Sequence, residues 1–272
     1  MRKIKIKFKF LAYPLAVISM SLFVIVGCSD DDPEPDSLTV SDIDGNVYRT
    51  VIIGDQEWMA ENLGVTRYNN GDAIPTGLSN EEWENTTEGA YAIYPHEGGG
   101  TEDHVEGIGS DEEMVDAYGK QYNWWTVDDS RGLCPEGWRV PSDDDWTQLV
   151  NYVADQGFPN SSVANGAGNA LKSCRQVDSP LGDSCDTSVH PCWNSDDTHY
   201  GFDEFGFSAL PGGLRWTTGG FLRIGHFGYW WSSTETSSAD AFCRYMTKSG
   251  GLVLRNDFNK RLGFSVRCVR DL

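Results

Sequence analysis

The sequence predicts an α+β domain in which short antiparallel strands accompany one strong amphipathic helix and long loops. Three observations lead to this fold class. Residues 142–157 carry an apolar stripe at helical spacing. Short apolar and aromatic segments separated by glycine pairs run from residue 205 to residue 270, which is the pattern of an antiparallel sheet. Near residue 45, further short strands flank an Asp-Gly turn and need partners elsewhere in the chain.

The first element along the chain is an export signal. Five basic residues precede an apolar segment over residues 11–26, which is the layout of a secretory signal. The segment ends in IVGC at residues 25–28, which resembles a bacterial lipobox. We therefore interpret residues 1–27 as a lipoprotein signal peptide and Cys28 as the lipidated first residue of the mature chain. The alternative is a plain transmembrane anchor, because about 17 apolar residues nearly span a bilayer.

An acidic tether follows the lipidation site. Residues 28–38 are rich in Asp, Glu and Pro, so they cannot build a core and should be disordered. The segment also resembles the acidic export signal of surface-displayed Bacteroidetes lipoproteins, although a solvated spacer has the same composition. We expect a lipid-anchored protein of the outer membrane that is exposed on the cell surface. Residues 39–272 remain, a length within the range of one domain with long loops.

The domain is expected to begin with a hairpin. Residues 40–48 predict a strand, a tight turn at Asp44-Gly45 and a second strand that continues to Ile53. Residues 56–59 return after a turn at Gly54. An EF-type calcium loop is excluded at this turn, because such a loop needs a further carboxylate before the glycine and a glutamate six residues after it.

The following stretch is mostly loop. Residues 64–112 are dominated by turn-forming and acidic residues and predict long surface loops with one short helix near residues 80–85. Residues 119–127 are apolar and aromatic and predict a buried strand.

The strongest helix signal lies at residues 142–157. Ser142 and Asp145 form a variant capping box, Trp146 begins the apolar stripe, and Gly157 is the expected C-cap. Three consecutive acids, residues 143–145, resemble a metal cluster. Successive helical side chains point about 100° apart, so these acids suit the helix N-terminus and not one shared ion.

A second, weaker helix is expected at residues 168–173. Residues 174–199 are polar and irregular and predict a disulfide-stapled loop. Five short strands should follow, at residues 205–210, 228–232, 241–247, 251–255 and 264–270.

The charge of the chain excludes one class of partner. The chain has 21 basic and 41 acidic residues, and removal of residues 1–27 takes away five basic residues and no acidic one, which leaves a net charge of −25. Such a protein repels phosphate backbones, so we expect no binding to nucleic acid. Neutral ligands, cationic ligands and Ca²⁺ remain open.

The cysteines predict a disulfide framework. With Cys28 assigned to the lipid, six of the seven cysteines remain, an even number in an exported domain. A zinc site is disfavoured because no C-x-x-C pair is present. We expect three disulfides, with one or two free thiols as the alternative.

Several strings in the chain match one family. They are DGNVYRTV (44–51), WMAENL (58–63), YNWW (122–125), GLCPEGWRVPS (132–142), LPGG (210–213), GYWWSSTE (228–235) and GFSVRCV (263–269). In this order they resemble the Fibrobacter succinogenes major paralogous domain, often called FISUMP, over nearly the whole mature chain. The resemblance implies a C-type-lectin-like fold, distantly similar to formylglycine-generating enzymes, on exported proteins. It also implies a Cys134–Cys268 disulfide. The remaining cysteines look like additions to the family pattern, and their pairing stays open: Cys174, Cys185, Cys192 and Cys243.

The leading functional hypothesis is a surface module that binds a ligand without catalysis, with glycans as the favoured ligand class. The best candidate site is Trp193 and Asn194 beside Asp196 and Asp197, because a tryptophan in a polar loop has little core to join. The alternative is that Trp193 plugs the disulfide loop. Trp216 is a second candidate for stacking on a sugar.

Other functions are less favoured. Calcium-dependent lectins of this fold use a Glu/Gln-Pro-Asn/Asp tripeptide with Trp-Asn-Asp, whereas here Ser195 follows Asn194 and the tripeptide is missing. No cofactor is expected, although four carboxylates still offer a Ca²⁺ site: Asp196, Asp197, Asp203 and Glu204. An enzyme of the formylglycine-generating type would use a cysteine pair, but the cysteines are better explained as disulfides, and the five histidines form no recognisable triad motif. A glycan-active enzyme would use a pair of acids, and among 41 carboxylates no pair stands out. The main alternative is a structural or adhesive protein of the envelope or a fimbria that binds a protein partner.

Overall fold

Two sheets form the framework of the chain in the computed structural model, which describes residues 38–98 and 105–272. The first sheet has the order β1-β2-β3-β11, and all of its pairs are antiparallel. Its strands are β1 (Thr39–Ser41), β2 (Val47–Ile53), β3 (Gln56–Met59) and β11 (Val269–Asp271). The predicted signal peptide, Cys28 and residues up to 37 lie outside the described residues.

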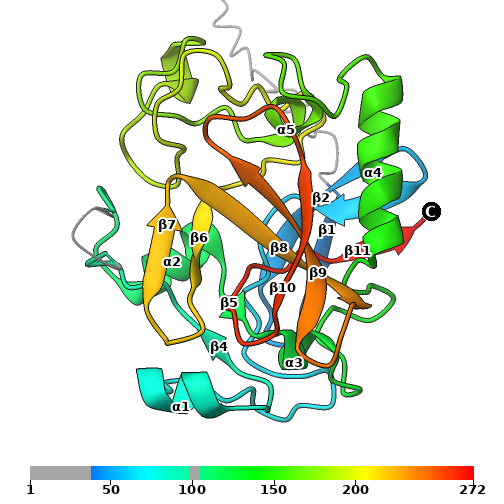
Figure 1. Cartoon of the computed structure of the whole chain (residues 1–272), viewed down its shortest axis with the longest axis vertical. Helices are drawn as coiled ribbons and strands as arrows, with labels where there is room; N and C mark the ends of the chain where they lie inside the picture. The colour runs from blue at the N-terminus through cyan, green and yellow to red at the C-terminus, as the bar shows by residue number, and fades with distance from the viewer. Residues whose placement is uncertain (1–37, 99–104) are drawn as a thin grey trace, which may run out of the picture. The chain divides into compact units, whose positions relative to one another are not determined.

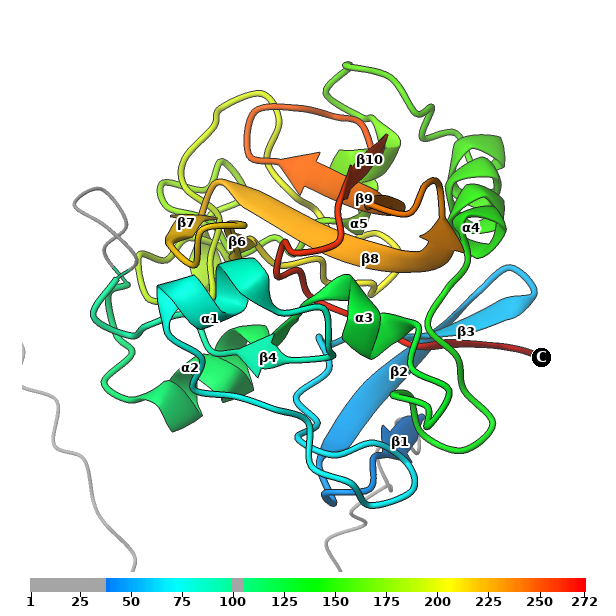
Figure 2. The same cartoon turned by 60° about the horizontal axis from the view of Figure 1, so that its bottom comes forward.

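The two ends of the domain meet in this first sheet. Strand β11 pairs with β3 through Val269 and Trp58, and in Figure 2 the red C-terminal strand runs beside the blue β3. The β1–β2 turn forms as predicted: the Asp42 carboxylate accepts the backbone N–H groups of Asp44 and Asn46 at 2.9 and 3.0 Å, and Gly45 has φ = +86°. The acids of this turn therefore stabilise the turn.

The second sheet has five strands in the order β10-β9-β8-β6-β7, and it fills the centre of Figure 1. Its strands are β6 (Gly212–Arg215), β7 (Phe221–Ile224), β8 (Phe227–Glu235), β9 (Asp240–Thr247) and β10 (Leu254–Asn259). Only β6 and β8 pair in parallel. A further two-stranded pair joins β4 (Tyr91–Ala92) to β5 (Gln121–Tyr122).

Strand β8 is buried on both faces. Trp230 and Trp231 are neighbours in the chain, so they point to opposite sides of the strand, and both are fully buried. Trp231 joins the core cluster that contains the Cys134–Cys268 pair, whereas Trp230 joins the cluster beneath helix α4. In that second cluster the rings of Trp58 and Trp146 lie 4.8 Å apart. Aromatic side chains therefore fill the space on each side of the central sheet.

The helices are α1 (Asn80–Asn85), α2 (Asp111–Tyr118), α3 (Trp124–Val127), α4 (Asp143–Asp155) and α5 (Ala167–Leu171), with a 3₁₀ turn η1 (Asp183–Cys185). The longest of them, α4, has the predicted capping box, in which Ser142 Oγ accepts from the Asp145 backbone N–H and the Asp145 carboxylate accepts from the Ser142 N–H. Helix α4 contacts β8, β9 and α5. The helices α1 and α5 lie where the sequence predicts them.

Several predicted elements differ from the structure. Residues 119–127 form only the short β5 followed by a helical turn, because Asn123 caps that turn by accepting the Thr126 N–H. The predicted strand at residues 205–210 does not form, and within this segment only Ala209 takes part in a β-bridge, which it forms with Lys172. The predicted strand at 264–270 contracts to β11, and β10 begins three residues later than predicted. Helix α2 was not predicted.

The structure contains two disulfides among the described residues, not three. Cys134 bonds Cys268 with a Cα–Cα distance of 5.9 Å, as the family resemblance implied, and Cys174 bonds Cys185 across 11 residues. Cys192 and Cys243 are free and buried. The prediction of a third bridge is therefore wrong. Cys243 lies in the core on β9, whereas Cys192 lies in the segment of residues 174–199, which we call the cysteine-bearing loop.

Candidate functional site

The tryptophan predicted to contact ligand belongs to the core. Trp193 is only 1% exposed, and its indole N–H donates to the Ala209 carbonyl at 3.0 Å. The ammonium of Lys172 lies 5.2 Å from its ring centre. The expectation that Trp193 has little core to join is therefore wrong, and the alternative given for it, a plug beneath the disulfide loop, describes its position.

The polar residues after Trp193 stabilise their own loop. The Asn194 side-chain amide lies 2.7 Å from His226 Nε2. Asp196 accepts the backbone N–H groups of Thr198 and His199 at 3.0 and 2.6 Å. Burial alone would raise the pKa of Asp196, but these two bonds outweigh it and the pKa is lowered. Of the predicted polar residues, only Asp197 is exposed.

The carboxylates considered for Ca²⁺ do not form a metal site. In the described residues, no group of three or more His, Cys, Asp and Glu side chains is arranged to hold a metal ion. Asp203 instead accepts from the backbone N–H of Ser208 at 2.7 Å and from its hydroxyl. Asp203 is partly buried, and this burial raises the pKa of its carboxyl group.

Trp216 does reach the surface. It lies in the turn between β6 and β7 and is 43% exposed. The neighbouring Arg215 is buried, with its guanidinium 4.2 Å from the ring centre of Trp83, and it donates to the carbonyls of Gly219 and Leu78 at 3.0 and 2.8 Å. Burial lowers the pKa of Arg215 to about 10. These contacts hold the turn, and Trp216 with it, in one position.

A survey of all ten tryptophans narrows the choice of an aromatic contact. Seven are buried: Trp58, Trp83, Trp124, Trp146, Trp193, Trp230 and Trp231. Trp125 and Trp138 are partly exposed, and Trp216 is exposed. Among these three, Trp138 lines a hollow of about 310 Å³.

We call this hollow the Trp138 cleft. Its lining combines an apolar floor, an indole and three polar side chains. The floor is Val127, Leu133 and Val140, and the polar groups are Asn69, Arg139 and Ser233. A volume near 300 Å³ is at the small end of the range for ligand pockets, which are usually apolar with a few placed polar groups. An adjoining hollow of about 400 Å³ shares Asn69 and adds Asp42 and Glu136.

The backbone around the cleft is closely fixed. Asn69 donates its backbone N–H to the Gly132 carbonyl at 3.0 Å and its side-chain amide to the Cys134 carbonyl at 2.7 Å. Gly132 has φ = +78°, and a Cβ at this position would lie 2.8 Å from the Asn69 amide nitrogen. Only glycine satisfies both conditions. The Cys134–Cys268 disulfide then ties this wall to the C-terminal strand region.

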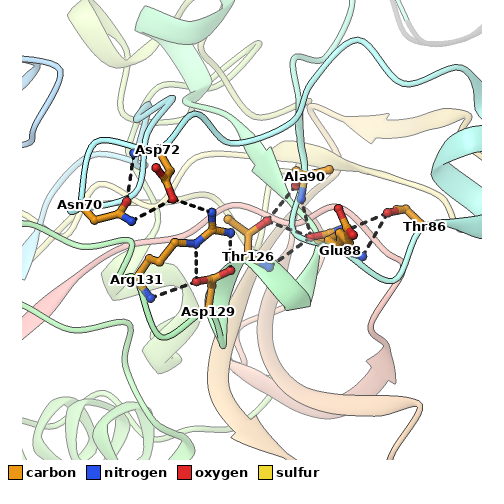
Figure 3. Close-up of polar contacts among 9 residues, drawn as sticks. Asn70, Asp72, Thr86, Glu88, Ala90, Thr126, Asp129 and Arg131 are labelled. Atoms are coloured by element: carbon orange, nitrogen blue, oxygen red, sulfur yellow. Dashed lines mark hydrogen bonds and ion pairs between the residues drawn. The ribbon is translucent and has the colours of Figure 1, made fainter.

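An arginine cluster anchors the loop that carries Asn69. Figure 3 shows Arg131 between two carboxylates, with Asp129 at 2.7 Å and Asp72 at 3.1 Å. Asn70 in turn donates to Asp72 at 2.9 Å. The Arg131 guanidinium also lies 3.9 Å from the ring centre of Tyr68. Hydrogen bonding by Arg131 lowers the pKa of Asp129, which favours the charged carboxylate. The ion pairs of Arg131 therefore join the loop that contains Asn69 and Asp72 to the loop that contains Asp129.

A second set of bonds in Figure 3 supports the cleft floor. The Thr126 hydroxyl donates to the Ala90 carbonyl at 3.0 Å. The Ala90 N–H in turn donates to Asn123 Oδ1 at 3.0 Å. These bonds fix α3, whose last residue, Val127, lines the cleft.

The charges beside the cleft are matched within the protein. Arg139 donates to Asp145 at 2.6 Å and to Asp271 at 2.8 Å. Arg270 lies 5.0 Å from the Trp138 ring centre and pairs with Glu57. The lining contains no histidine and no free cysteine. The arrangement therefore suits a neutral polar ligand that takes hydrogen bonds and packs against the indole.

Sequence reasoning did not single out this cleft. Its wall is the string at residues 132–142, which entered only as a mark of the family. The available signal was a tryptophan between two glycine-containing turns and next to a predicted disulfide, but nothing in the sequence places Asn69 beside it.

The comparisons with known proteins are consistent with those strings. The family model described as Fibrobacter succinogenes major domain matches residues 51–270. No curated protein and no solved structure matches the chain, so the C-type-lectin-like fold stays a prediction. Within the described residues, no helix has the length and the apolar character needed to cross a membrane.

Proposed function

This chain belongs to the Fibrobacter succinogenes major domain family, and from that premise we propose that it is a non-catalytic module that captures a neutral glycan in the Trp138 cleft. One observation carries the proposal: a partly exposed indole, an amide, a hydroxyl and a guanidinium surround one apolar hollow. Sugars present both C–H faces and hydroxyl groups, so they match a lining of this mixed kind.

The binding chemistry divides between two kinds of contact. The Trp138 ring packs its apolar face against the C–H face of a sugar ring, while its indole N–H can meet a polar group. Asn69 Oδ1 accepts a sugar hydroxyl, because the amide nitrogen already donates to Cys134. Ser233 and Arg139 complete the set of polar neighbours. Since the supporting loops are already bonded to one another, little ordering is required on binding.

We propose binding without turnover. Nucleophilic catalysis requires an activated group with a base beside it. The cleft lining offers one serine, no histidine and a cysteine that is held in a disulfide. The cleft lining therefore offers no activated nucleophile, which supports a proposal of binding alone.

The location of the protein is part of the same proposal. The lipobox-like ending at Cys28 and the acidic residues 28–38 support a lipid-anchored protein at the outer surface of the cell. From that position the domain would meet extracellular glycans. Globomycin treatment of the native host, which blocks removal of lipoprotein signals, should leave an unprocessed form of higher mass; an unchanged mass would contradict lipidation at Cys28.

A glycan array tests the binding proposal. The mature chain should bind a subset of neutral glycans, and Trp138→Ala should abolish that binding. Trp216→Ala is the matched control, because it also removes a surface indole but lies outside the cleft. Both variants must keep the melting temperature of the parent to within a few degrees. If neither variant changes glycan binding, or if no glycan binds, the proposal is wrong.

A second function is favoured by Trp216. An exposed tryptophan on a rigid turn is the type of residue that dominates protein–protein interfaces, and Leu222 on the adjacent β7 is also exposed. Adhesion to a protein partner through this turn is therefore the alternative. A pull-down from surface extracts that Trp216→Ala abolishes and Trp138→Ala leaves intact would select it.

A further inference from the structure

A second polar pocket lies where the first sheet, α2 and the cysteine-bearing loop meet. Its volume is about 210 Å³, and its lining shares no residue with the Trp138 cleft. We call it the arginine pocket and define it by Arg49, Glu61, Asn62, Asp116, Ser173 and Arg175. These residues come from distant parts of the sequence, so only the folded chain assembles them.

Backbone carbonyls hold Arg175, which lines the pocket. Its Nε donates to the Pro191 carbonyl at 2.8 Å and its Nη2 donates to the Val189 carbonyl at 2.9 Å, which fixes the guanidinium. Among the described residues it has no carboxylate partner, and the same holds for the buried Arg215 and Arg267, whereas seven other arginines each pair with at least one carboxylate. Its Nη1 donates to no other described group. A fixed guanidinium therefore lines the pocket with donor capacity left over.

Arg49 adds a second guanidinium to the same lining. Its Nε donates to Glu61 at 2.8 Å, and its backbone N–H donates to the other Glu61 oxygen at 2.9 Å. Both oxygens of Glu61 thus face Arg49, and the charge of that carboxylate is matched. The terminal nitrogens of Arg49 donate to no group within the described part of the chain. The remaining acid, Asp116, is exposed on α2.

The floor of the pocket is rigid. Asn62 accepts from the Trp230 indole and from Arg267 Nε, both at 2.9 Å, and donates to the Tyr118 carbonyl at 2.8 Å. Arg267 is fully buried and also donates to the carbonyls of Phe207 and Ser208. Ser208, which lines the pocket, has φ = +51°, a conformation that non-glycine residues adopt at a cost. Bonds within the protein therefore occupy the polar groups of the floor, and the Arg175 and Arg49 guanidinium groups are the donors that remain for a ligand.

We propose that the arginine pocket binds the carboxylate of a small acidic ligand, with Arg175 as the main donor and Arg49 as the second. A planar guanidinium matches a carboxylate through paired, charge-assisted hydrogen bonds. The negative charge of the whole chain opposes an anion. That field is screened beyond about 8 Å at physiological salt, however, whereas the two guanidinium groups act at contact distance. Asp116 at the rim would accept a hydroxyl or an ammonium group of the same ligand.

Two sources supply such a carboxylate, and the test separates them. Glucuronate represents an acidic sugar, and glucose is its neutral counterpart. A tripeptide with a free C-terminus represents a peptide end, and the same tripeptide with a C-terminal amide is its neutral counterpart. Each is titrated into the mature chain while the Arg Nε–H signals are followed by NMR. In each pair the acid should shift the Arg175 and Arg49 signals, and the neutral compound should not. The acid that binds with the lower Kd identifies the class of ligand, an acidic sugar or a peptide C-terminus.

Variants make the assignment specific. Arg175→Gln should weaken the tighter acid about tenfold or more, and Arg49→Gln should weaken it less. Arg223→Gln, a surface arginine on β7, is the matched control and should bind like the parent. If Arg175→Gln fails to fold, Arg175→Lys keeps the charge and should still bind several-fold more weakly, because it loses the forked geometry.

Two results would overturn the proposal: no shift with either acid at millimolar concentration, or equal binding of an acid and its neutral counterpart. Failure here leaves the glycan proposal untouched, because no tryptophan lines the arginine pocket. Failure of glycan binding at Trp138 likewise says nothing about the arginine signals.

Discussion

Lys172 provides the sharpest test of how the cysteine-bearing loop is placed. Its side chain is 1% exposed, and its ammonium donates to the His199 carbonyl and to the Thr247 carbonyl at 3.0 Å. Two longer contacts, at 3.4 and 3.3 Å, reach the carbonyls of Lys248 and Gly250. One amino group thus joins the end of α5, the loop after Trp193 and the turn between β9 and β10. We consider the substitution Lys172→Met, which keeps the length of the side chain and removes the charge.

The expected loss of stability follows from the two closer carbonyls. A buried acceptor left without its partner costs about 1–3 kcal/mol. The substitution also relieves the burial of a charge, which offsets part of that cost. We therefore expect the free energy of unfolding to fall by about 2–4 kcal/mol. For a domain of this size that corresponds to about 5–15 °C in melting temperature.

Urea unfolding followed by tryptophan fluorescence measures this loss. Lys248→Met is the matched control, because its ammonium also donates to a loop carbonyl, Ser195 at 3.3 Å, but at an exposed position. The control should change stability by less than about 0.5 kcal/mol. A Lys172→Met protein as stable as the parent would refute the reasoning, because the carbonyl groups around Nζ would then need no N–H donor.

The same pair of proteins gives a pH dependence with a definite sign. Burial lowers the pKa of Lys172 from 10.5 to about 7, and Asp196 opposes the shift. Between these values the unfolded chain binds the proton and the folded chain does not. The stability contributed by this group is therefore fully present above pH 10.5 and is lost as the pH falls to 7. The difference between parent and Lys172→Met should grow with rising pH across this window, by at most about 1.4 kcal/mol per pH unit. A difference that is constant or shrinks contradicts the lowered pKa.

Three further outcomes are expected. Cys192 and Cys243 should resist thiol reagents in the native protein and react after unfolding, because burial raises the pKa of Cys192 to about 11 and that of Cys243 well above its usual value; native labelling seen by mass spectrometry would contradict this. Replacing Cys134 and Cys268 together by alanine should cost about 2–5 kcal/mol in urea unfolding, and a smaller loss would mean that the bridge is not structural. Asp145→Ala should cost about 1–2 kcal/mol at pH 7. Burial raises the pKa of Asp145, but bonds from Arg139 and Ser142 outweigh it and lower that pKa, so the difference from the parent should vanish as the pH falls through it; a difference that persists in acid would count against the cap.

The elements that sequence predicts well are those whose signal is local. The capping box at Ser142 and Asp145 and the stripe after them depend on residues within one helix, and α4 forms as predicted. The turn at Gly45 has the same character, because Asp42 and Gly45 set it within four residues. Local hydrogen bonds and periodicity can be recognised in the sequence, so helix α4 and the Gly45 turn could be predicted from it.

The elements that sequence missed depend on distant contacts. Residues 119–127 have the composition of a strand, but Asn123 caps a helical turn after only two paired residues. Helix α2 is acidic and weakly apolar, and two of its residues, Met114 and Tyr118, are buried against other parts of the chain. Tertiary packing decides both cases, and composition alone does not reveal it.

The candidate site shows the same division. A polar neighbourhood suggested that Trp193 faces solvent, yet residues from α5 and the 205–209 segment bury it. Trp138 looked like part of a family motif, yet it lines a hollow whose other wall, Asn69, is far away in sequence. Trp216, by contrast, is 43% exposed in the turn between β6 and β7, as its polar and glycine-rich neighbourhood suggested.

The proposal that a glycan contacts Trp138 can be measured directly by ¹⁹F NMR of protein labelled with 5-fluorotryptophan. Variants Trp125→Phe, Trp138→Phe and Trp216→Phe assign the three signals that belong to the surface. Titration with a glycan that binds on the array should shift the Trp138 signal and leave those of Trp125 and Trp216 in place. A shift confined to Trp216, or no shift in any of the three while the glycan is bound, would contradict the account.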